Sequence, residues 1–199
     1  GYRQWGALLV ARNENDHARL RALLSWQEDL GFDSEWVEPA ELRDLEPTLP
    51  EGLLGGMLAN DAGSVNVRRL TRALAAAAAR RGALVLEHIP ALGVATSGNL
   101  ATGVRLAGVT LPAAQVVLAA GAWTARFGLE LGQPLPTVPV KGQMLALGGL
   151  VHPPRTIIGG AGGYLVPWTD GTVGVAATEE EAGFDTRVTP AGLRALVGL

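Results

Sequence analysis

The residues that could do acid–base, metal or thiol chemistry are few and scattered in this sequence. Cysteine is absent, which excludes thiolate catalysis, disulfides and zinc held by cysteine. The three histidines, His17, His88 and His152, lie too far apart to form a ligand set by spacing, and we interpret each as a surface or strand residue. The sequence also lacks the Gly-x-Ser-x-Gly motif of a hydrolase and the Gly-Lys-Ser/Thr motif of a phosphate-binding loop. No metal site is therefore predicted, and no catalytic side chain is identified.

The segment 116–123, with the sequence VVLAAGAW, is the best candidate for a binding site. It predicts a buried strand that ends in Ala119, Ala120 and Gly121, small residues that let a ligand approach the backbone. Open α/β sheets bind nucleotides at the carboxyl ends of their strands. An ordinary tight turn between a strand and a helix explains the same pattern equally well. The glycine cluster at 159–163 lacks the spacing of a dinucleotide-binding motif, and we interpret it as a flexible loop.

Hydrophobic patterning and capping signals predict the elements that would position these residues. Helices are predicted at about 15–30, 38–46 and 66–81, and from 189 onward. Strands are predicted at 5–12, 53–59, 83–88 and 115–120, with hairpins at 94–107 and 164–177. We expect the alanine-rich face of the 66–81 helix to pack against a sheet. We also expect the 115–120 strand to be buried on both of its faces, because it is almost wholly apolar.

Composition excludes several classes of protein. The 199 residues include 16 Lys+Arg and 19 Asp+Glu, a net charge of −3 without a block of either sign, so a nucleic-acid groove is not expected. No apolar run approaches the roughly 20 residues that span a bilayer. A cysteine-free chain suits the cytoplasm. The patterning of residues 1–60 and 134–199 is typical of mixed, mainly antiparallel structure. Residues 61–133 instead resemble a helix and the strands of a sheet covered on both sides. This division favours two domains that are discontinuous in sequence.

Five groups of residues occur in an order typical of one known family. They are LGGM with DAGSVNVRRL (54–70), EHIPAL (87–92), VVLAAGAW (116–123), VPVKGQ (138–143), and YLVP, DG and ATEE (164–180). Each motif alone is weak, but the five in order span essentially the whole chain. The sequence therefore resembles the D-amino acid oxidase superfamily of FAD-dependent oxidoreductases, and within it the glycine oxidases of thiamin biosynthesis.

The resemblance implies a fold that is part α/β and part α+β. A portion of a Rossmann-like FAD-binding domain, at 61–133, would be interleaved with an antiparallel-sheet substrate domain with flanking helices, at 1–60 and 134–199. The family's Gly-x-Gly-x-x-Gly motif and its later substrate-binding arginine are not found in this sequence. We therefore expect a central piece of a longer protein, which by itself would bind FAD weakly or not at all.

The resemblance also implies four cofactor-binding residues. Ala91 would hold the adenine through its backbone N–H and C=O, and the FAD would lie against Ala120 and Gly121, where a larger side chain would intrude. Trp123 would brace this turn. The alternative for Trp123, a core tryptophan that packs the following helix, stays open and is favoured over direct contact with the flavin.

Two substrate-binding residues follow from the same resemblance. The Tyr164 phenol would donate a hydrogen bond to the substrate carboxylate, or would be an ordinary strand aromatic. Glu179 falls at the position of a residue in the pocket wall, although a solvated run of Glu179, Glu180 and Glu181 is favoured. Lys141 is interpreted as a solvated lysine. We expect Gly121 and Tyr164 to face one cavity.

The implied reaction is oxidative deamination of glycine or another small amino acid, with a hydride passed to FAD and hydrogen peroxide formed from oxygen. Such chemistry is carried by the cofactor, so a sequence without a catalytic dyad is compatible with it. Two alternatives remain: a quinone-linked amino-acid dehydrogenase of the same fold, and a non-catalytic binding module that lacks FAD. The expected partner is a small amino acid or amine, without nucleic acid or membrane, and homo-oligomerisation stays open.

Overall fold

The computed structural model describes residues 2–160 and 162–198, which form two compact units. Unit 1 comprises Gly1–Arg72, Gly142–Glu179 and Thr186–Leu199. Unit 2 comprises Ala73–Lys141 and Glu180–Asp185. The chain thus enters unit 2 twice, once through the helix that crosses residue 73 and again through the short segment 180–185.

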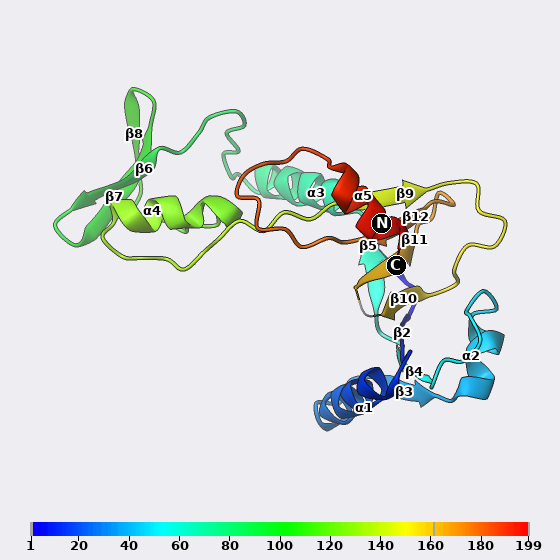
Figure 1. Cartoon of the computed structure of the whole chain (residues 1–199). Helices are drawn as coiled ribbons and strands as arrows, with labels where there is room; N and C mark the ends of the chain where they lie inside the picture. The colour runs from blue at the N-terminus through cyan, green and yellow to red at the C-terminus, as the bar shows by residue number, and fades with distance from the viewer. Residues whose placement is uncertain (1, 161, 199) are drawn as a thin grey trace. The chain divides into compact units, whose positions relative to one another are not determined.

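A seven-stranded mixed sheet forms the centre of unit 1 (Figure 1). In spatial order its strands are β3 (Ser34–Val37), β4 (Gly56–Ala59), β2 (Ala7–Val10), β10 (Ile157–Gly160), β11 (Gly163–Pro167), β12 (Val173–Ala176) and β9 (Met144–Leu147). β2 and β10 run parallel, and the other neighbouring pairs are antiparallel. A separate two-stranded ribbon pairs β1 (Tyr2–Gln4) with β5 (Gly63–Val65).

Helix α1 (Glu14–Asp29) covers one face of this sheet. The Asn13 side chain caps the helix by accepting a hydrogen bond from the Asp16 N–H at 2.9 Å. Gly31, at φ +77°, follows the helix in the left-handed region that glycine adopts without strain. The cluster beneath the helix contains the buried residues Ala11, Leu20, Leu24 and Met57. The predicted 15–30 helix is therefore confirmed.

Helix α2 (Pro39–Leu45) covers the opposite face. Glu38 and Glu41 form a capping box at its start, and its predicted extent is confirmed. Its cluster contains the buried residues Leu8, Val10, Val37, Leu42, Leu49 and Leu58. Leu9, between Leu8 and Val10 on β2, packs instead against the α1 cluster, as the alternation of side chains along a strand requires.

The carboxyl-terminal part of unit 1 is held together by Gln143. Helix α5 (Pro190–Val197) begins where predicted, with Thr189 as its N-cap residue. The Gln143 amide donates to Thr189 Oγ1 at 2.9 Å and accepts from Thr189 N at 2.8 Å, while Gln143 N donates to Thr178 Oγ1 at 2.9 Å. Gly192 faces this buried glutamine, because a Cβ there would overlap the Gln143 side chain. Gln143, in the VPVKGQ motif, therefore connects Thr178 of the ATEE motif to the start of α5.

Unit 2 is built on a three-stranded antiparallel sheet, β6 (Gly93–Ser97), β7 (Leu100–Leu106) and β8 (Val109–Pro112). Its first two strands confirm the predicted 94–107 hairpin. A single 3₁₀ turn, η1 (Gly121–Trp123), leads into helix α4 (Thr124–Glu130), and an Arg105–Glu130 ion pair joins α4 to β7. Helix α3 (Val67–Arg80), predicted at 66–81, crosses the boundary between the two units.

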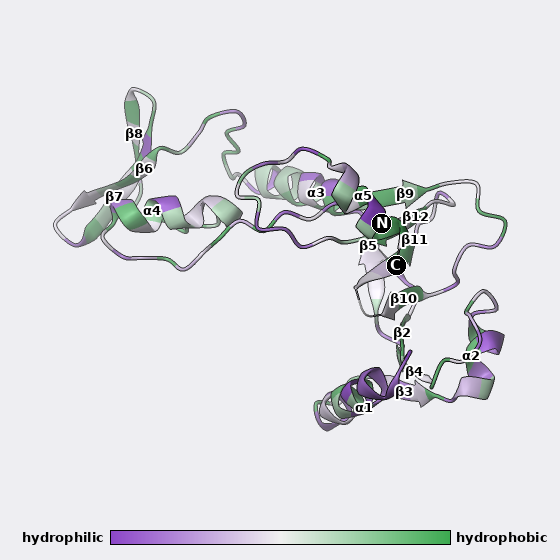
Figure 2. Ribbon diagram, in the orientation of Figure 1, coloured by the Kyte–Doolittle hydropathy of each residue, from purple (hydrophilic) through white to green (hydrophobic). Residues whose placement is uncertain are grey.

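Three predictions about unit 2 are wrong. Residues 83–88 and 115–120 form no strand, and Val117, expected to be buried on both faces, is 86% exposed. A strand requires a hydrogen-bonded neighbour, and neither segment has one among the described residues. Helix α3 has no buried residue, so its apolar face, which includes Leu70 and Leu74, is not packed on a sheet. Figure 2 shows the mixed hydrophobic and hydrophilic residues along α3.

Candidate cofactor and substrate sites

Ala91 and Ala120, two residues expected to bind the cofactor, lie in the wall of the same pocket of unit 2. The pocket has a volume of about 270 Å³. Its other lining residues are apolar or small: Gly93, Val94, Val104, Val116, Val117, Leu118, Ala119 and Phe127. Because segment 115–120 forms no strand, its backbone is not engaged in a sheet and borders this pocket directly. The pocket is suited to a flat aromatic ring such as adenine, whose faces can pack on apolar side chains.

Gly121 begins a tight turn at the edge of this region. Its φ of +52° lies in the left-handed region, and the Trp123 N–H closes the turn on the Ala120 carbonyl at 3.0 Å. A Cβ at Gly121 would meet no atom within 4 Å, so the backbone conformation, and not crowding within the chain, requires glycine here. The turn therefore presents its backbone to open space.

Trp123 is not a core tryptophan. Its side chain is 53% exposed and stacks on Phe184, with ring centroids 5.3 Å apart and an interplanar angle of 25°. Trp123 does not line the Ala91–Ala120 pocket, although it closes the turn beside it. This partner could not be predicted from the sequence, because 61 positions separate the two aromatic residues.

A second, more polar cavity of about 710 Å³ lies beside the first in unit 2. Val94, Val116 and Leu118 line both cavities. The larger one also contains the Arg105–Glu130 ion pair. Unit 2 thus offers an apolar pocket next to a wider polar one.

Tyr164 lies on β11 of unit 1, where it pairs with Gly159 of β10 and Ala176 of β12. Its side chain is 46% exposed and lines a cavity of about 260 Å³, together with Arg12. Most of the remaining lining is apolar: Val10, Leu49, Pro50, Leu53, Ile158 and Leu165. A cation and a phenol in an otherwise apolar cavity suit a small carboxylate.

Sequence reasoning missed Arg12, because its position depends on which strands are neighbours in the sheet. Arg12 comes two residues after the end of β2, and the glycine cluster comes at the end of β10. Since β2 and β10 are parallel neighbours, their carboxyl ends meet at one edge of the sheet. The cluster itself is not a simple loop: Gly159 and Gly160 belong to β10 and Gly163 to β11, while residue 161 lies outside the described residues. A Cβ at Gly159 would overlap the Leu9 side chain.

The glutamate run at 179–181 is not uniformly solvated. Glu179, expected near the substrate, is exposed. Glu180 forms an ion pair with Lys141 at 3.3 Å, and the Lys141 side chain is only 9% exposed, so the interpretation of Lys141 as a solvated lysine is wrong. Backbone hydrogen bonds in both directions, each 2.9 Å long, reinforce this pair. The Glu180 side chain therefore has a structural role in unit 2.

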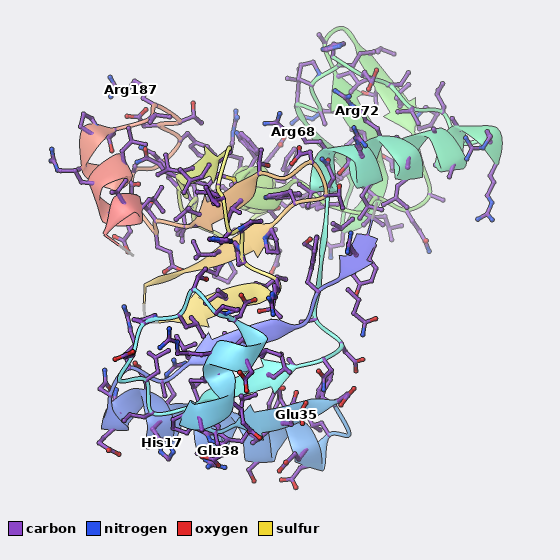
Figure 3. All side chains as sticks on the ribbon, turned by 90° about the vertical axis from the view of Figure 1, so that its right-hand side faces the viewer. His17, Glu35, Glu38, Arg68, Arg72 and Arg187 are labelled. Carbon is purple, nitrogen blue, oxygen red and sulfur yellow. The ribbon has the colours of Figure 1, made fainter. Side chains whose placement is uncertain are left out.

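The histidines form no common site among the described residues. His17, on α1, lies edge-on against Trp36 with ring centroids 4.9 Å apart, and Figure 3 labels His17 among the side chains of unit 1. His152 lines a cavity with Glu46 and Arg155. In residues 2–160 and 162–198, no three His, Asp or Glu side chains are grouped as a metal site would require. In the same residues, no helix is long and apolar enough to cross a membrane.

Residues 1–198 match the family described as FAD dependent oxidoreductase. The chain therefore belongs to this family of FAD-dependent enzymes. Its mixed α/β fold, as predicted, is that of glycine oxidase structures. The crystal structure of glycine oxidase from Geobacillus kaustophilus superimposes with a TM-score of 0.92 and 30% identity, over 100% of this chain and 54% of that one. The crystal structure of glycine oxidase from Bacillus cereus superimposes with a TM-score of 0.86 and 26% identity, over 100% of this chain and 56% of that one.

Curated relatives support the same relationship. The glycine oxidase of Geobacillus kaustophilus is 31% identical over 196 residues, which are 96% of this chain and 51% of that protein. The bifunctional protein ThiO/ThiG of Synechocystis sp. is 33% identical over 170 residues, 83% of this chain and 25% of that protein. The chain thus spans about half the length of the glycine oxidases that it matches.

The described residues of unit 2 leave room for a cofactor such as FAD. The apolar pocket between Ala91 and Ala120 is open to a planar ring, and the turn at Gly121 leaves its backbone uncovered. The small side chains of Ala119 and Ala120 allow a cofactor to approach the main chain. These residues would hold one side of the cofactor.

Proposed function

We propose that the protein to which this chain belongs oxidises glycine or another small amino acid with FAD as its electron acceptor. The family match over residues 1–198 is the observation that carries the proposal, since it covers the cofactor motifs and the Tyr164 motif together. Similarity to glycine oxidases from two organisms supports an amino acid as the substrate.

The chain's own residues would bind and orient the reactants. In this proposal Ala91 binds the adenine through its backbone, and Ala120 and Gly121 lie along the cofactor. The chemistry that bound FAD would supply is hydride transfer from the α-carbon of the amino acid, followed by reoxidation by oxygen to give hydrogen peroxide. Tyr164 donates a hydrogen bond to the substrate carboxylate, and the Arg12 charge favours that carboxylate in the same cavity. Glu179 is proposed as part of the pocket wall.

The proposal assigns a role to each part of the chain. Residues 61–133 are the middle part of an FAD-binding domain, and residues 1–60 and 134–199 belong to the substrate domain. A cytoplasmic location remains the prediction from the cysteine-free sequence.

Activity of the full-length protein tests the proposal. The purified protein is incubated with glycine, sarcosine and D-alanine in turn, and both hydrogen peroxide and ammonia or methylamine are measured. The proposal predicts equal amounts of peroxide and amine with at least one of these substrates. Amine release without peroxide, seen only when a quinone or dye is added, would instead indicate a dehydrogenase. A protein that oxidises none of them would contradict the proposed function.

A further inference from the structure

The Trp123–Phe184 pair joins two segments of unit 2 that are far apart in sequence. Trp123 is the last residue of η1, and Phe184 belongs to segment 180–185. Their rings stack with centroids 5.3 Å apart, yet the Phe184 side chain, like that of Trp123, remains about half exposed at 52%. Stacked aromatic pairs are more stable than their buried area alone would suggest. The stack therefore restricts the orientation of the Trp123 indole although neither ring lies in a core.

Segment 180–185 is held in place at its start. Glu180 exchanges two backbone hydrogen bonds with Lys141, each 2.9 Å long, and its carboxylate pairs with the nearly buried Lys141 ammonium at 3.3 Å. Further along, Gly183 adopts φ +56°, and the Asp185 N–H donates to the Ala182 carbonyl at 3.1 Å. The Lys141 pairing and this local turn together fix the position from which Phe184 reaches Trp123.

Trp123 is in turn part of the backbone that borders the cofactor pocket. Its N–H donates to the carbonyl of Ala120, which lines the pocket, and Gly121 lies between them in the left-handed region. A change in the position of Trp123 would therefore shift the Ala120–Gly121 turn. A Cβ at Gly121 would have no atom within 4 Å, so no packing on that side supports the turn.

We propose that Phe184 is a positioning residue for the FAD site: through its stack on Trp123 it holds the Ala120–Gly121 turn in the conformation that binds the cofactor. The inference rests on the cofactor placement in the proposed function, but it does not depend on which substrate is oxidised. It also gives segment 180–185, which directly follows Glu179, a role in cofactor binding.

The test measures FAD affinity in the full-length protein. Apoprotein is titrated with FAD, and binding is followed by the quenching of flavin fluorescence for wild type, Phe184→Leu and Phe184→Tyr. Loss of the ring in Phe184→Leu is expected to raise the Kd for FAD about fivefold, whereas Phe184→Tyr keeps the stack and restores wild-type affinity. The visible circular dichroism of bound flavin, a spectroscopic readout independent of turnover, is expected to change in Phe184→Leu alone.

Phe32→Leu is the matched control. Phe32 has nearly the same exposure, 53%, and its ring lies 6.5 Å from that of another tryptophan, Trp26, but it belongs to unit 1. Its substitution is expected to leave the Kd for FAD unchanged. The inference is overturned if Phe184→Leu binds FAD as wild type does, if Phe184→Tyr fails to restore affinity, or if Phe32→Leu has an equal effect. If Phe184→Leu shows the expected effect but no amino acid is oxidised, the inference holds and the proposed substrate is wrong.

Discussion

Glu46 and Thr156 are joined by two hydrogen bonds in the interior of unit 1. Glu46 Oε1 accepts from Thr156 N at 2.5 Å and from Thr156 Oγ1 at 2.8 Å. It accepts a third hydrogen bond from Arg155 N at 2.8 Å. Both Glu46 and Thr156 are buried, and Thr156 immediately precedes β10. One carboxylate at the end of α2 therefore fixes the start of a central strand.

Removal of this carboxylate is expected to destabilise unit 1. Glu46→Ala leaves two backbone N–H groups without their acceptor in a buried place, and we expect the free energy of unfolding to fall by about 3 kcal/mol. Glu51→Ala is the control, because Glu51 is largely exposed and pairs with the exposed Arg43 at 2.9 Å. A loss of about 0.5 kcal/mol or less is expected for that variant. Urea unfolding followed by circular dichroism measures both. Equal losses in the two variants would contradict this account of Glu46.

Gly121→Ala should weaken cofactor binding more than it affects folding. The left-handed φ at Gly121 costs an alanine about 1 kcal/mol. Gly132→Ala is the matched control in unit 2, since Gly132 has φ +67° and open space around its Cβ position. We expect similar losses of unfolding free energy in both, but an increase of about tenfold in the Kd for FAD only in Gly121→Ala. An equal change in the Kd for FAD in Gly121→Ala and Gly132→Ala would contradict a cofactor bound beside Gly121.

Tyr164→Phe tests the substrate cavity separately from the cofactor. Loss of one hydrogen bond to a carboxylate is expected to raise the KM for the amino acid about tenfold, with the Kd for FAD unchanged. Tyr2→Phe is the control, because the Tyr2 hydroxyl donates to the Asp61 carbonyl at 3.2 Å outside the cavity. Steady-state kinetics of both variants measure the KM for the amino acid. A Tyr164→Phe enzyme with the wild-type KM would exclude this role for the phenol.

The titration of Asp170 tests how its carboxylate stabilises the turn between β11 and β12. The Thr172 hydroxyl, at 2.7 Å, and the Thr172 N–H, at 3.1 Å, donate to Asp170 Oδ1 and lower the pKa of that carboxyl. A pKa lowered by folding stabilises the hairpin above the unfolded pKa, about 3.9, and this stabilisation is lost as the pH falls through the folded pKa.

Thr172→Val removes the hydroxyl and should raise the pKa of Asp170 toward its ordinary value. The acid-induced loss of stability should then be smaller than in wild type. A carbon-detected NMR titration of the Asp170 carboxyl measures the pKa, with Thr169→Val as the control in the same turn. An unchanged Asp170 pKa in Thr172→Val would show that the hydroxyl does not stabilise the carboxylate.

Elements specified by local residues could be predicted from the sequence. Thr189 marks the beginning of α5, and Asp170-Gly171 marks the turn between β11 and β12. For α1 the sequence predicts Asn15 or Asp16 as the cap, whereas Asn13 caps the helix. These signals act within a few residues of one another, so a single sequence contains them. The same holds for the family motifs, which predicted the FAD-dependent family that the comparisons confirm.

Features that depend on distant partners could not be predicted in the same way. The apolar residues at 115–120 are typical of a buried strand, but a strand forms only where another segment pairs with it. The burial of Lys141 depends on its pairing with Glu180. The aromatic partner of Trp123, Phe184, lies on another segment. Arg12 reaches the Tyr164 cavity only because β2 and β10 are neighbours in the sheet.

The location of bound FAD tests the central claim most directly. A crystal structure of the full-length protein with FAD should place the adenine in the pocket between Ala91 and Ala120, within hydrogen-bond distance of the Ala91 backbone. The cofactor should then run past the Gly121 turn. An adenine bound elsewhere, with the Ala91–Ala120 pocket filled by other side chains of the protein, would contradict the account.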